Sequence, residues 1–442
     1  MSRSATPHRT RANRPLRQDL VDSAVLEVLG RVREQGWLAD RALEMVLRRE
    51  TRLYSGERRA AAEALYGVVR WQGQLEWLLG GRPGIAEIYA AWLARHGGLS
   101  APEAERRTGL RRGALSPLAG ADGRIAAVAD PANRLAAEES LPPWLARQLV
   151  ADLGLDEARS LARASNERAP LTVRANLLRT TRDALRDRLG RERMAAEPAR
   201  LSPWGLALTG HANAFSLPAF REGLFEVQDE GSQLVALACG ARPGMKVVDA
   251  CAGAGGKSLA LAAEMHNRGE ILALDVDPGR LEEARRRARR AGVHNLRTRA
   301  LPPGPEADLL LRDSEGKADL VLVDAPCSGL GTLRRKPDAR WRLAPGDPER
   351  FAATQRELVL RFSRMLAPGG RLVYATCSVT RVENEEVAAF ASELPGLRPF
   401  PLAGTLGEDL AREAGAEGNR LRLSPQRHGT DGFFAVAFER GR

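Results

Sequence analysis

The C-terminal half of the chain alternates between short apolar runs and longer helical stretches, and this rhythm limits the fold more than any other feature. The strand-like runs from Met245 onward are KVVDAC, EILALDV, ADLVLVDA and RLVYATC, with helical stretches such as 281–291 and 350–366 between them. Buried β-branched runs that alternate with helices are typical of a doubly wound, mostly parallel sheet with helices on both faces. The closing run GFFAVAFER (432–440) predicts an added edge strand. We therefore expect an α/β fold here.

The N-terminal part has a different, helical pattern. Apolar residues such as Val21, Val25 and Val28 recur at helical spacing across 19–79, which predicts an all-α domain. Residues 97–130 are rich in Gly, Pro, Ala and Arg and predict a surface insertion followed by a linker. The predicted parts are a disordered basic arm (1–17), a helical domain with an insertion near 97–130 (18–135), a small α/β linking domain (136–225) and the doubly wound domain (226–442).

The four cysteines, Cys239, Cys251, Cys327 and Cys377, are few and scattered for a chain of 442 residues. They form no CxxC pair and no Cys/His cluster at zinc-ligand spacing, so we expect neither a disulfide framework nor a metal. This usage suits a reducing cytoplasm. No apolar run approaches membrane-spanning length, and the basic first residues lack the apolar core of a secretory signal, so we expect no membrane segment.

The chain is strongly basic, with a formal net charge of +11 and arginine as its main cation. Such an excess favours a polyanionic partner, because the arginine fork matches phosphates and stacks on bases. GC-rich coding would also enrich arginine, so charge alone makes a nucleic acid plausible without establishing it.

The first strand of the doubly wound domain leads into a turn of small residues. Such residues let the backbone approach a ligand, and the helix that follows offers free N–H groups. The second strand ends at Asp275, which can bind ribose hydroxyls, and Arg280 lies one helical turn on, near enough to orient it. Asp249 and the absence of a GxGxxG motif favour S-adenosylmethionine over a nicotinamide. The candidate cofactor residues are Cys251, Ala252, Gly253, Ala254, Gly255, Gly256, Lys257, Asp275, Arg280 and Asp324.

Two further strands deliver cysteines. One ends at Asp324 and leads to Cys327, and the other ends at Thr376 and leads to Cys377. Parallel strands place their carboxyl ends at one edge of a sheet, so both thiols and Asp324 should converge beside the cofactor. A free cysteine is commonly a small buried hydrophobe, and we accept that interpretation for Cys239.

This trio suits methylation of C5 in cytosine. That carbon becomes nucleophilic only after a thiolate adds at C6, and a base must later remove the C5 proton so that the enzyme can leave. Asp324 near N3 and N4 of the base would stabilise the developing charge. The target base must leave its stack or lie in a single strand. Residue chemistry alone leaves open which cysteine attacks.

The motifs DACAGAGGK, LALDVDPGR, LVDAPCSGLGTLRRKPDARW, LVYATCSVTRVENEE and HGTDGFF resemble, in order and spacing, the Nop2/Sun-type RNA 5-methylcytosine methyltransferases. Upstream, LTVRANLL and FEVQDEGSQLVA are similar to that family's approach to its catalytic domain. GERRAAAEALYGVVRWQGQLEWLL resembles the helical NusB-like RNA-binding domain of bacterial members, which methylate a cytosine in small-subunit ribosomal RNA.

The resemblance implies a Rossmann-like domain that binds S-adenosylmethionine, with Cys377 as nucleophile and Cys327 assisting proton removal and release. Cys251 to Lys257, Asp275 and Asp324 would form the cofactor and base pocket. It further implies an RNA partner, and 16S ribosomal RNA is preferred over transfer RNA. A monomer would suffice to act on so large an RNA, so we expect a monomer. The alternatives are a transfer-RNA methyltransferase, a DNA cytosine methyltransferase, which Thr376-Cys377 disfavours, and a non-catalytic ribosome-assembly factor.

The chain departs from the family pattern at two places. The family turn commonly reads Ala-Pro-Gly-Gly-Lys, whereas this chain has Gly253-Ala254 in place of Ala-Pro. The acid expected after the third strand is missing, since 296–301 reads LRTRAL, and Glu306 and Asp308 are the candidate replacements. The basic run Arg334, Arg335, Lys336 and Arg340 beside Trp341 predicts either an RNA contact or a solvated loop.

Overall fold

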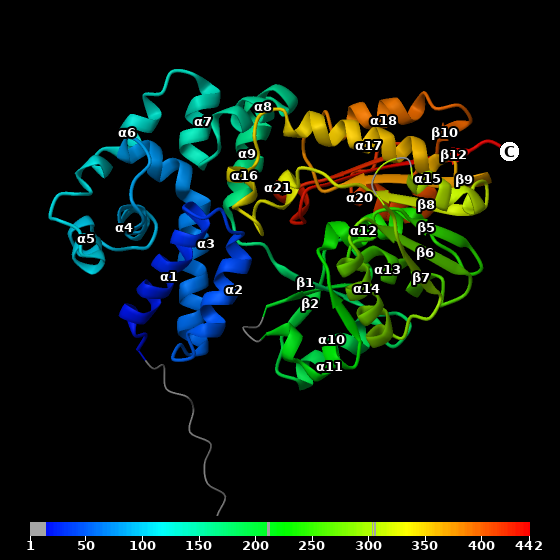
Figure 1. Cartoon of the computed structure of the whole chain (residues 1–442), viewed down its shortest axis with the longest axis horizontal. Coiled ribbons are helices and arrows are strands. Elements are labelled where there is room, and N and C mark those ends of the chain that lie inside the picture. Colours follow the sequence, from blue (N-terminus) through cyan, green and yellow to red (C-terminus); the bar gives the residue numbers. More distant parts are fainter. Residues whose placement is uncertain (1–14, 210–212, 303, 305) are drawn as a thin grey trace, which may run out of the picture. The chain divides into compact units, whose positions relative to one another are not determined.

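The computed structural model describes residues 15–209, 213–302, 304 and 306–442 (Figure 1). It divides into two compact units, Met1–Arg147 and Gln148–Arg442. Most of the predicted basic arm, residues 1–14, lies outside the described residues. No helix in the described part of the chain is long and apolar enough to cross a membrane.

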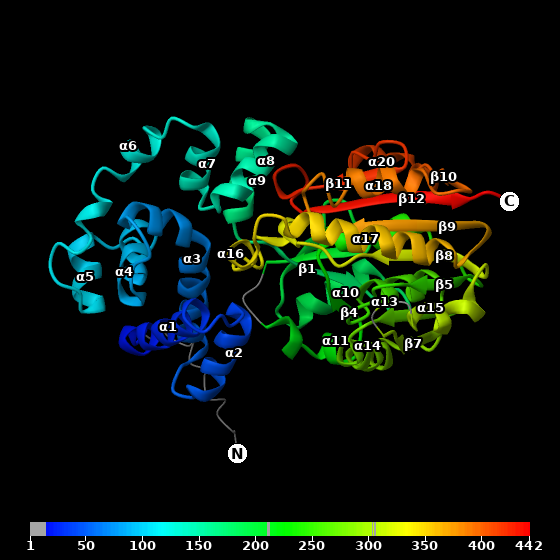
Figure 2. The same cartoon turned by 45° about the horizontal axis from the view of Figure 1, so that its top comes forward.

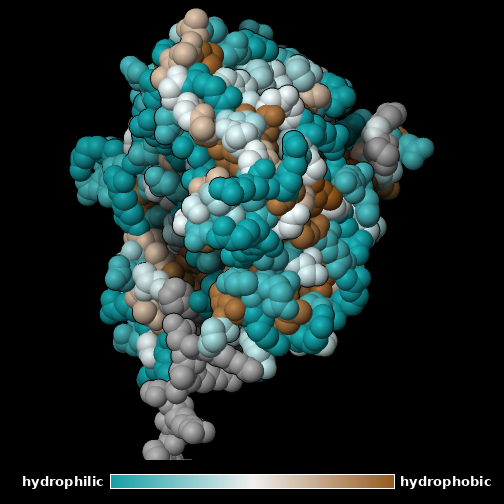
Figure 3. Space-filling model, turned by 90° about the vertical axis from the view of Figure 1, so that its left-hand side faces the viewer, coloured by the Kyte–Doolittle hydropathy of each residue, from teal (hydrophilic) through white to brown (hydrophobic). Residues whose placement is uncertain are grey.

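The first unit is helical and is built on the long helix α3. The apolar face of α3 is buried. The Trp92 ring of α4 packs directly against Gly67, where a Cβ would lie only 2.5 Å from the ring. Figure 3 shows a face that is mainly hydrophilic with small apolar patches. The helices are α1 (Gln18–Arg33), α2 (Ala39–Arg49), α3 (Ser55–Leu79), α4 (Ile85–Arg95), α5 (Ala101–Thr108), α6 (Ala121–Ala126) and α7 (Pro131–Glu139).

Residues 97–130, predicted to be a surface insertion followed by a linker, form the helices α5 and α6, so the loop-like linker was wrong. Ile125 of α6 packs with Leu78 of α3, and Arg107 of α5 donates to Asp22 of α1 at 2.7 Å. The glycines that suggested a loop end helices instead: Gly109 adopts the left-handed conformation directly after α5.

The second unit begins within α8 and continues with α9 and a small antiparallel sheet in the order β2-β3-β1-β4. Its core joins the strands to α10 through Val173, Leu185, Leu206 and Phe225, all fully buried. The elements are α8 (Pro143–Leu153), α9 (Leu155–Asn166), β1 (Leu171–Ala175), α10 (Arg182–Arg191), β2 (Ala196–Pro198), β3 (Gly205–Leu208), α11 (Pro218–Arg221) and β4 (Phe225–Val227).

The large sheet of this unit has the order β10-β12-β9-β8-β5-β6-β7, and β11 pairs with β12. The five strands from β7 to β9 are parallel neighbours, which confirms the predicted doubly wound α/β fold. The strands are β5 (Lys246–Asp249), β6 (Glu270–Asp275), β7 (Leu296–Ala300), β8 (Ala318–Asp324), β9 (Leu366–Thr376), β10 (Leu397–Pro399), β11 (Arg420–Leu423) and β12 (Phe433–Arg440).

The strand predicted at the edge of the sheet, β12, is an interior strand. It pairs antiparallel with β9 on one side and with both β10 and β11 beyond it. The short strands β10 and β11 lack the long apolar pattern of β12, which is why the sequence did not reveal them.

Alternation along the central strands builds a core on each face of the sheet. Leu320 and Leu322 face α12 and α13, whereas Val321 and Val323 face α17 and α18 (Figure 2). The helices are α12 (Glu230–Cys239), α13 (Gly256–Glu264), α14 (Pro278–Ala291), α15 (Glu306–Leu311), α16 (Ala339–Arg342), α17 (Asp347–Ser363), α18 (Glu385–Ser392), α19 (Ala403–Leu406), α20 (Glu408–Glu413) and α21 (Pro425–His428).

The small sheet depends on a close backbone approach at Gly223, which follows α11. Its φ is +73°, and a Cβ there would lie 2.0 Å from the Arg290 carbonyl oxygen of α14. Gly223→Ala should therefore combine left-handed strain with a backbone clash. Gly316→Ala is the matched control, because its φ of +68° is similar but its surroundings are open.

Left-handed strain should lower the free energy of unfolding of both variants by about 1–2 kcal/mol. The backbone clash should lower that of Gly223→Ala by a further amount of about 1–3 kcal/mol. Thermal unfolding of the two variants checks this, and equal melting temperatures would show that α14 yields to the new side chain.

Candidate active site at the carboxyl edge of the sheet

The carboxyl ends of β5, β6, β8 and β9 bring the predicted site residues to one edge of the large sheet. Lys257 Nζ, at the start of α13, donates to Asp324 Oδ2 at 2.6 Å. The Sγ atoms of Cys327 and Cys377 lie 3.3 Å apart, although the residues are 50 positions apart in sequence. The predicted convergence of an acid and two thiols is therefore observed, with Lys257 bound to the acid.

The turn after β5 is held against the end of β6. Gly253 N–H donates to Asp275 Oδ2 at 2.8 Å, and Asp277 N–H donates to Asp275 Oδ1 at 2.9 Å. Gly255 has a φ of +80°, and a Cβ there would lie 2.9 Å from Ala284 Cβ, so the turn needs glycine at this position.

The prediction that Arg280 orients Asp275 was wrong. The exposed Arg280 guanidinium instead lies 3.6 Å from Asp277, which caps the N-terminus of α14. Arg280 lies one turn into α14 and therefore shares a helix face with the N-cap carboxylate of Asp277. Helix spacing alone did not distinguish Asp277 from Asp275 as its partner. Backbone N–H groups, rather than a guanidinium, orient Asp275.

An arginine that was not predicted supports the turn. Arg287 Nη1 donates to the Ala254 carbonyl oxygen at 2.8 Å, and the same guanidinium binds the buried carboxylate of Glu226 on β4 at 2.9 Å. Arg174 Nη1 of β1 lies 3.4 Å from the Gly256 carbonyl oxygen. These contacts restrain the turn at the position where the family's usual proline is replaced by Ala254.

The residues around the turn fit a nucleoside cofactor that carries an ammonium group. Asp275 keeps acceptor lone pairs for ribose hydroxyls, and the adjoining Val276 is 69% exposed, as expected for an apolar surface that a ligand covers. Burial raises the pKa of Asp249 to about 7, although Ser258 donates to its Oδ2 at 2.6 Å. Its buried Oδ1 has no hydrogen-bond partner among the described residues and could accept from an ammonium.

Of the two candidate replacements for the acid missing after β7, Asp308 accepts from Arg361 Nε of α17 at 2.7 Å. Glu306 at the start of α15 is exposed and remains the other candidate.

The two thiols are chemically distinct although they are in contact. A hydrogen bond from Cys327 lowers the pKa of Cys377, and the positive charge of Lys257 acts in the same direction. The same hydrogen bond and burial raise the pKa of Cys327 well above its usual value. Cys377 is therefore the better thiolate of the pair. Burial also raises the pKa of Cys239 and Cys251, which suits packing roles.

A buried polar cluster that the sequence did not identify as part of the site lies under the two cysteines. Glu383 is fully buried and accepts from Ser328 N at 2.7 Å and from the Ser378 hydroxyl at 2.5 Å. Asn384 accepts from the Thr376 hydroxyl at 2.6 Å. The only sequence signal was a serine after each cysteine.

The predicted RNA-contact run is largely a structural ion-pair cluster. Arg334 Nε donates to Asp431 Oδ1 at 2.8 Å, and Arg335 binds Asp431 and Asp229 at 2.6 and 2.7 Å. Arg340 is fully buried and donates to Asn166. The solvated-loop interpretation was therefore wrong for Arg334 and Arg340, which are buried and bound to partners far away in sequence. Lys336 is exposed.

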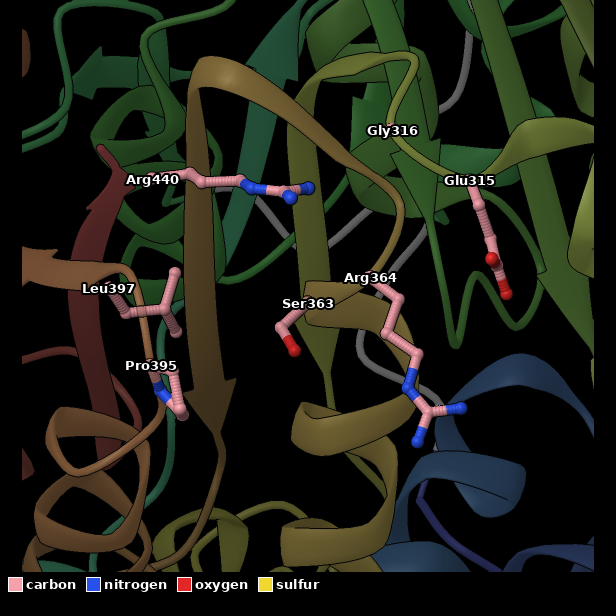
Figure 4. A pocket seen from close by; sticks show the side chains of 7 residues that line it. All are labelled: Glu315, Gly316, Ser363, Arg364, Pro395, Leu397 and Arg440. Carbon is pink, nitrogen blue, oxygen red and sulfur yellow. The ribbon is translucent and has the colours of Figure 1, made fainter. Parts of the chain in front are cut away.

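A different hollow opens near the amino ends of β8 and β9, and Figure 4 shows its lining side chains spread around it. Its volume is about 450 Å³, and it contains none of the predicted site residues. It is lined by Glu315, Gly316, Ser363, Arg364, Pro395, Leu397 and Arg440.

The sequence and fold are similar to those of known proteins over most of the chain. Residues 236–439 match the family of 16S rRNA methyltransferases RsmB/F, and residues 141–214 match an RsmF/B-like ferredoxin-like domain. The ribosomal RNA small subunit methyltransferase B of Xanthomonas campestris pv. campestris is 34% identical over 358 residues, covering 79% of this chain and 78% of that protein. The protein of the same name from Xylella fastidiosa is 35% identical, covering 68% and 67%.

The solved structure of PH0851 has a TM-score of 0.78 and 26% identity, covering 96% of this chain and 99% of that one. A methyltransferase homologue from Pyrococcus horikoshii has a TM-score of 0.59 and 28% identity, covering 71% and 100%. These findings confirm the Rossmann-like methyltransferase fold and the family resemblance. The chain belongs to the RsmB/F family of S-adenosylmethionine-dependent 16S rRNA methyltransferases.

Proposed function

We propose that this protein methylates C5 of a cytosine in small-subunit ribosomal RNA through a covalent bond between Cys377 Sγ and C6 of the base. The observation that carries this proposal is the thiol pair, with sulfurs 3.3 Å apart. The ion pair of Lys257 and Asp324 flanks it at the same sheet edge. The names of the relatives in Xanthomonas and Xylella support ribosomal RNA as the substrate.

Addition begins at the thiol with the lower pKa. Cys377 Sγ donates an electron pair to C6, and the C5–C6 double-bond electrons move toward C5 and the N3 side of the ring. We expect the Asp324 carboxylate to accept from the N4 amino group, and a proton delivered through the Lys257–Asp324 pair to neutralise the negative charge that develops at N3. When bound, S-adenosylmethionine supplies the methyl group that C5 accepts.

Release needs a base, and Cys327 suits this role. Once Cys377 is bonded to carbon, the hydrogen bond that raises the pKa of Cys327 is lost, and its proton can pass to solvent. The resulting thiolate takes the C5 proton. The C5–H electrons re-form the C5–C6 double bond, and the electrons of the S–C6 bond return to Cys377.

The cofactor side of the site uses residues of the first two strand ends. Asp275 would hold the ribose hydroxyls, Val276 would cover an apolar face, and Asp249 would accept from the ammonium group. The turn 252–257 would lie against the remaining part of the cofactor, with Arg287 holding its backbone.

The first test is methyl transfer from labelled S-adenosylmethionine to unmodified 16S ribosomal RNA, with transfer RNA and DNA as parallel acceptors. Wild type should label ribosomal RNA as 5-methylcytosine. Cys377→Ala should be inactive, since the carbon is no longer activated. Cys327→Ala should retain a protein–RNA adduct, because the release step is blocked.

Each other outcome changes the conclusion. Activity in Cys377→Ala would mean that the nucleophile is misassigned. Labelling of transfer RNA alone would mean that the substrate is transfer RNA and not ribosomal RNA. Binding of RNA with no methyl transfer and no cofactor binding would favour an assembly factor.

The second test concerns Asp275. Asp275→Asn removes the charge that would bind the ribose hydroxyls, and a hydrogen bond to a charged group contributes roughly 1.5–3 kcal/mol. The dissociation constant for S-adenosylmethionine, measured by calorimetry, should therefore rise roughly tenfold to a hundredfold. Asp183→Asn on the exposed face of α10 is the control and should bind like wild type. Unchanged affinity in Asp275→Asn would place the ribose elsewhere.

A further inference from the structure

The carboxylate of Glu383 is the most heavily bonded acid in the active-site region. It is fully buried and accepts from five donors. The donors are Ser328 N at 2.7 Å, Ser328 Oγ at 2.5 Å, Ser378 Oγ at 2.5 Å, Thr380 Oγ1 at 2.8 Å and Gln355 Nε2 at 3.2 Å. All are neutral groups. A buried carboxylate is costly, and only a full set of donors makes it stable.

Four of these donors come from the two cysteine loops, and the fifth, Gln355, comes from α17. Ser328 directly follows Cys327, and Ser378 directly follows Cys377. Their hydroxyls lie 3.0 Å apart, with one Glu383 oxygen bonded to both. Glu383 therefore ties together the residues next to the two sulfurs.

Glu383 is itself fixed by elements outside the loops. The Tyr374 hydroxyl of β9 shares its one proton between the Glu383 carbonyl oxygen at 2.5 Å and Gln355 Oε1 at 2.9 Å. Gln355 of α17 also donates to the Pro326 carbonyl oxygen at 3.0 Å, one residue before Cys327. The anchor is thus rigid on the sheet side and on the helix side.

Thiol activation does not explain a carboxylate at this place. The hydrogen bond from Cys327 lowers the pKa of Cys377, whereas the negative charge of Glu383 acts in the opposite direction. The charge of Glu383 opposes thiolate formation, yet its carboxylate contacts both cysteine loops. Its role is therefore to position the two loops.

We infer that Glu383 is the positioning residue that holds Cys327 against Cys377, so that release follows methyl transfer within one turnover. This inference rests on the proposed function, in which the two thiols act in sequence on one base. Loosening the link should leave Cys377 able to attack and leave Cys327 badly placed for proton removal. The expected defect is a stalled covalent adduct rather than a general loss of activity.

The experiment compares adduct and turnover in wild type, Glu383→Ala, Glu383→Gln, Ser328→Ala and Cys327→Ala, with unmodified 16S ribosomal RNA and S-adenosylmethionine. Glu383→Ala should lower turnover by roughly tenfold to a hundredfold, as small misplacements in active sites do. It should also accumulate the denaturation-resistant adduct that we expect in Cys327→Ala. Glu386→Ala is the matched control, since Glu386 is a half-exposed neighbour on α18 and should behave like wild type.

The conservative variants separate positioning from folding. In Glu383→Gln, the amide oxygen can accept from Ser328 N–H while its NH₂ donates to the hydroxyls, so turnover should largely recover and the adduct should fall. Ser328→Ala removes one of the hydrogen-bonded links and should accumulate less adduct than Glu383→Ala. If Glu383→Ala does not fold, Ser328→Ala still tests the positioning role.

Two results overturn different claims. Folded Glu383 and Ser328 variants that lose turnover without adduct, while Cys327→Ala accumulates it, would refute the positioning role alone. Absence of adduct in Cys327→Ala would refute the proposed function beneath it.

Discussion

The parallel register between β8 and β9 is the constraint on which the site depends. Asp324 lies opposite Ala375, so the two strands end at the same level and their loops begin side by side. Backbone pairing alone brings Cys327 and Cys377 to one place, yet a distance of 3.3 Å between sulfurs needs finer control. That control comes from the polar groups around Glu383, which is why a buried charge persists beneath two thiols.

The cofactor side follows the same plan of regular strands with local polar support. β5 and β6 deliver the glycine turn and Asp275 to neighbouring positions of one edge. Arg287 then restrains the turn from α14 and joins it to Glu226 of the small sheet. The small sheet thus supports the proposed cofactor site through its contacts with α14, in addition to the close approach at Gly223.

Local patterns predicted the features that local physics determines. The alternation of KVVDAC, ADLVLVDA and RLVYATC specified the central strands, and parallel topology then specified which residues meet. Long-range partners were beyond such patterns: Arg334 and Arg335 suggested a surface run because Asp229 and Asp431 lie about 100 positions away. Glu383 was not assigned to the site because Ser328 is 55 positions away, whereas Arg280 failed for a local reason, since Asp275 and Asp277 are both close to it in sequence.

The division of labour between the two thiols is the central claim, and a trapped adduct tests it most directly. Ribosomal RNA carrying 5-fluorocytosine at the target position holds fluorine where the departing proton should be, so the enzyme cannot complete release. After incubation with S-adenosylmethionine, protease digestion and mass spectrometry locate the modified residue. Our account predicts the nucleotide on Cys377 in wild type and in Cys327→Ala, and no adduct in Cys377→Ala. A nucleotide attached to Cys327 would contradict the account.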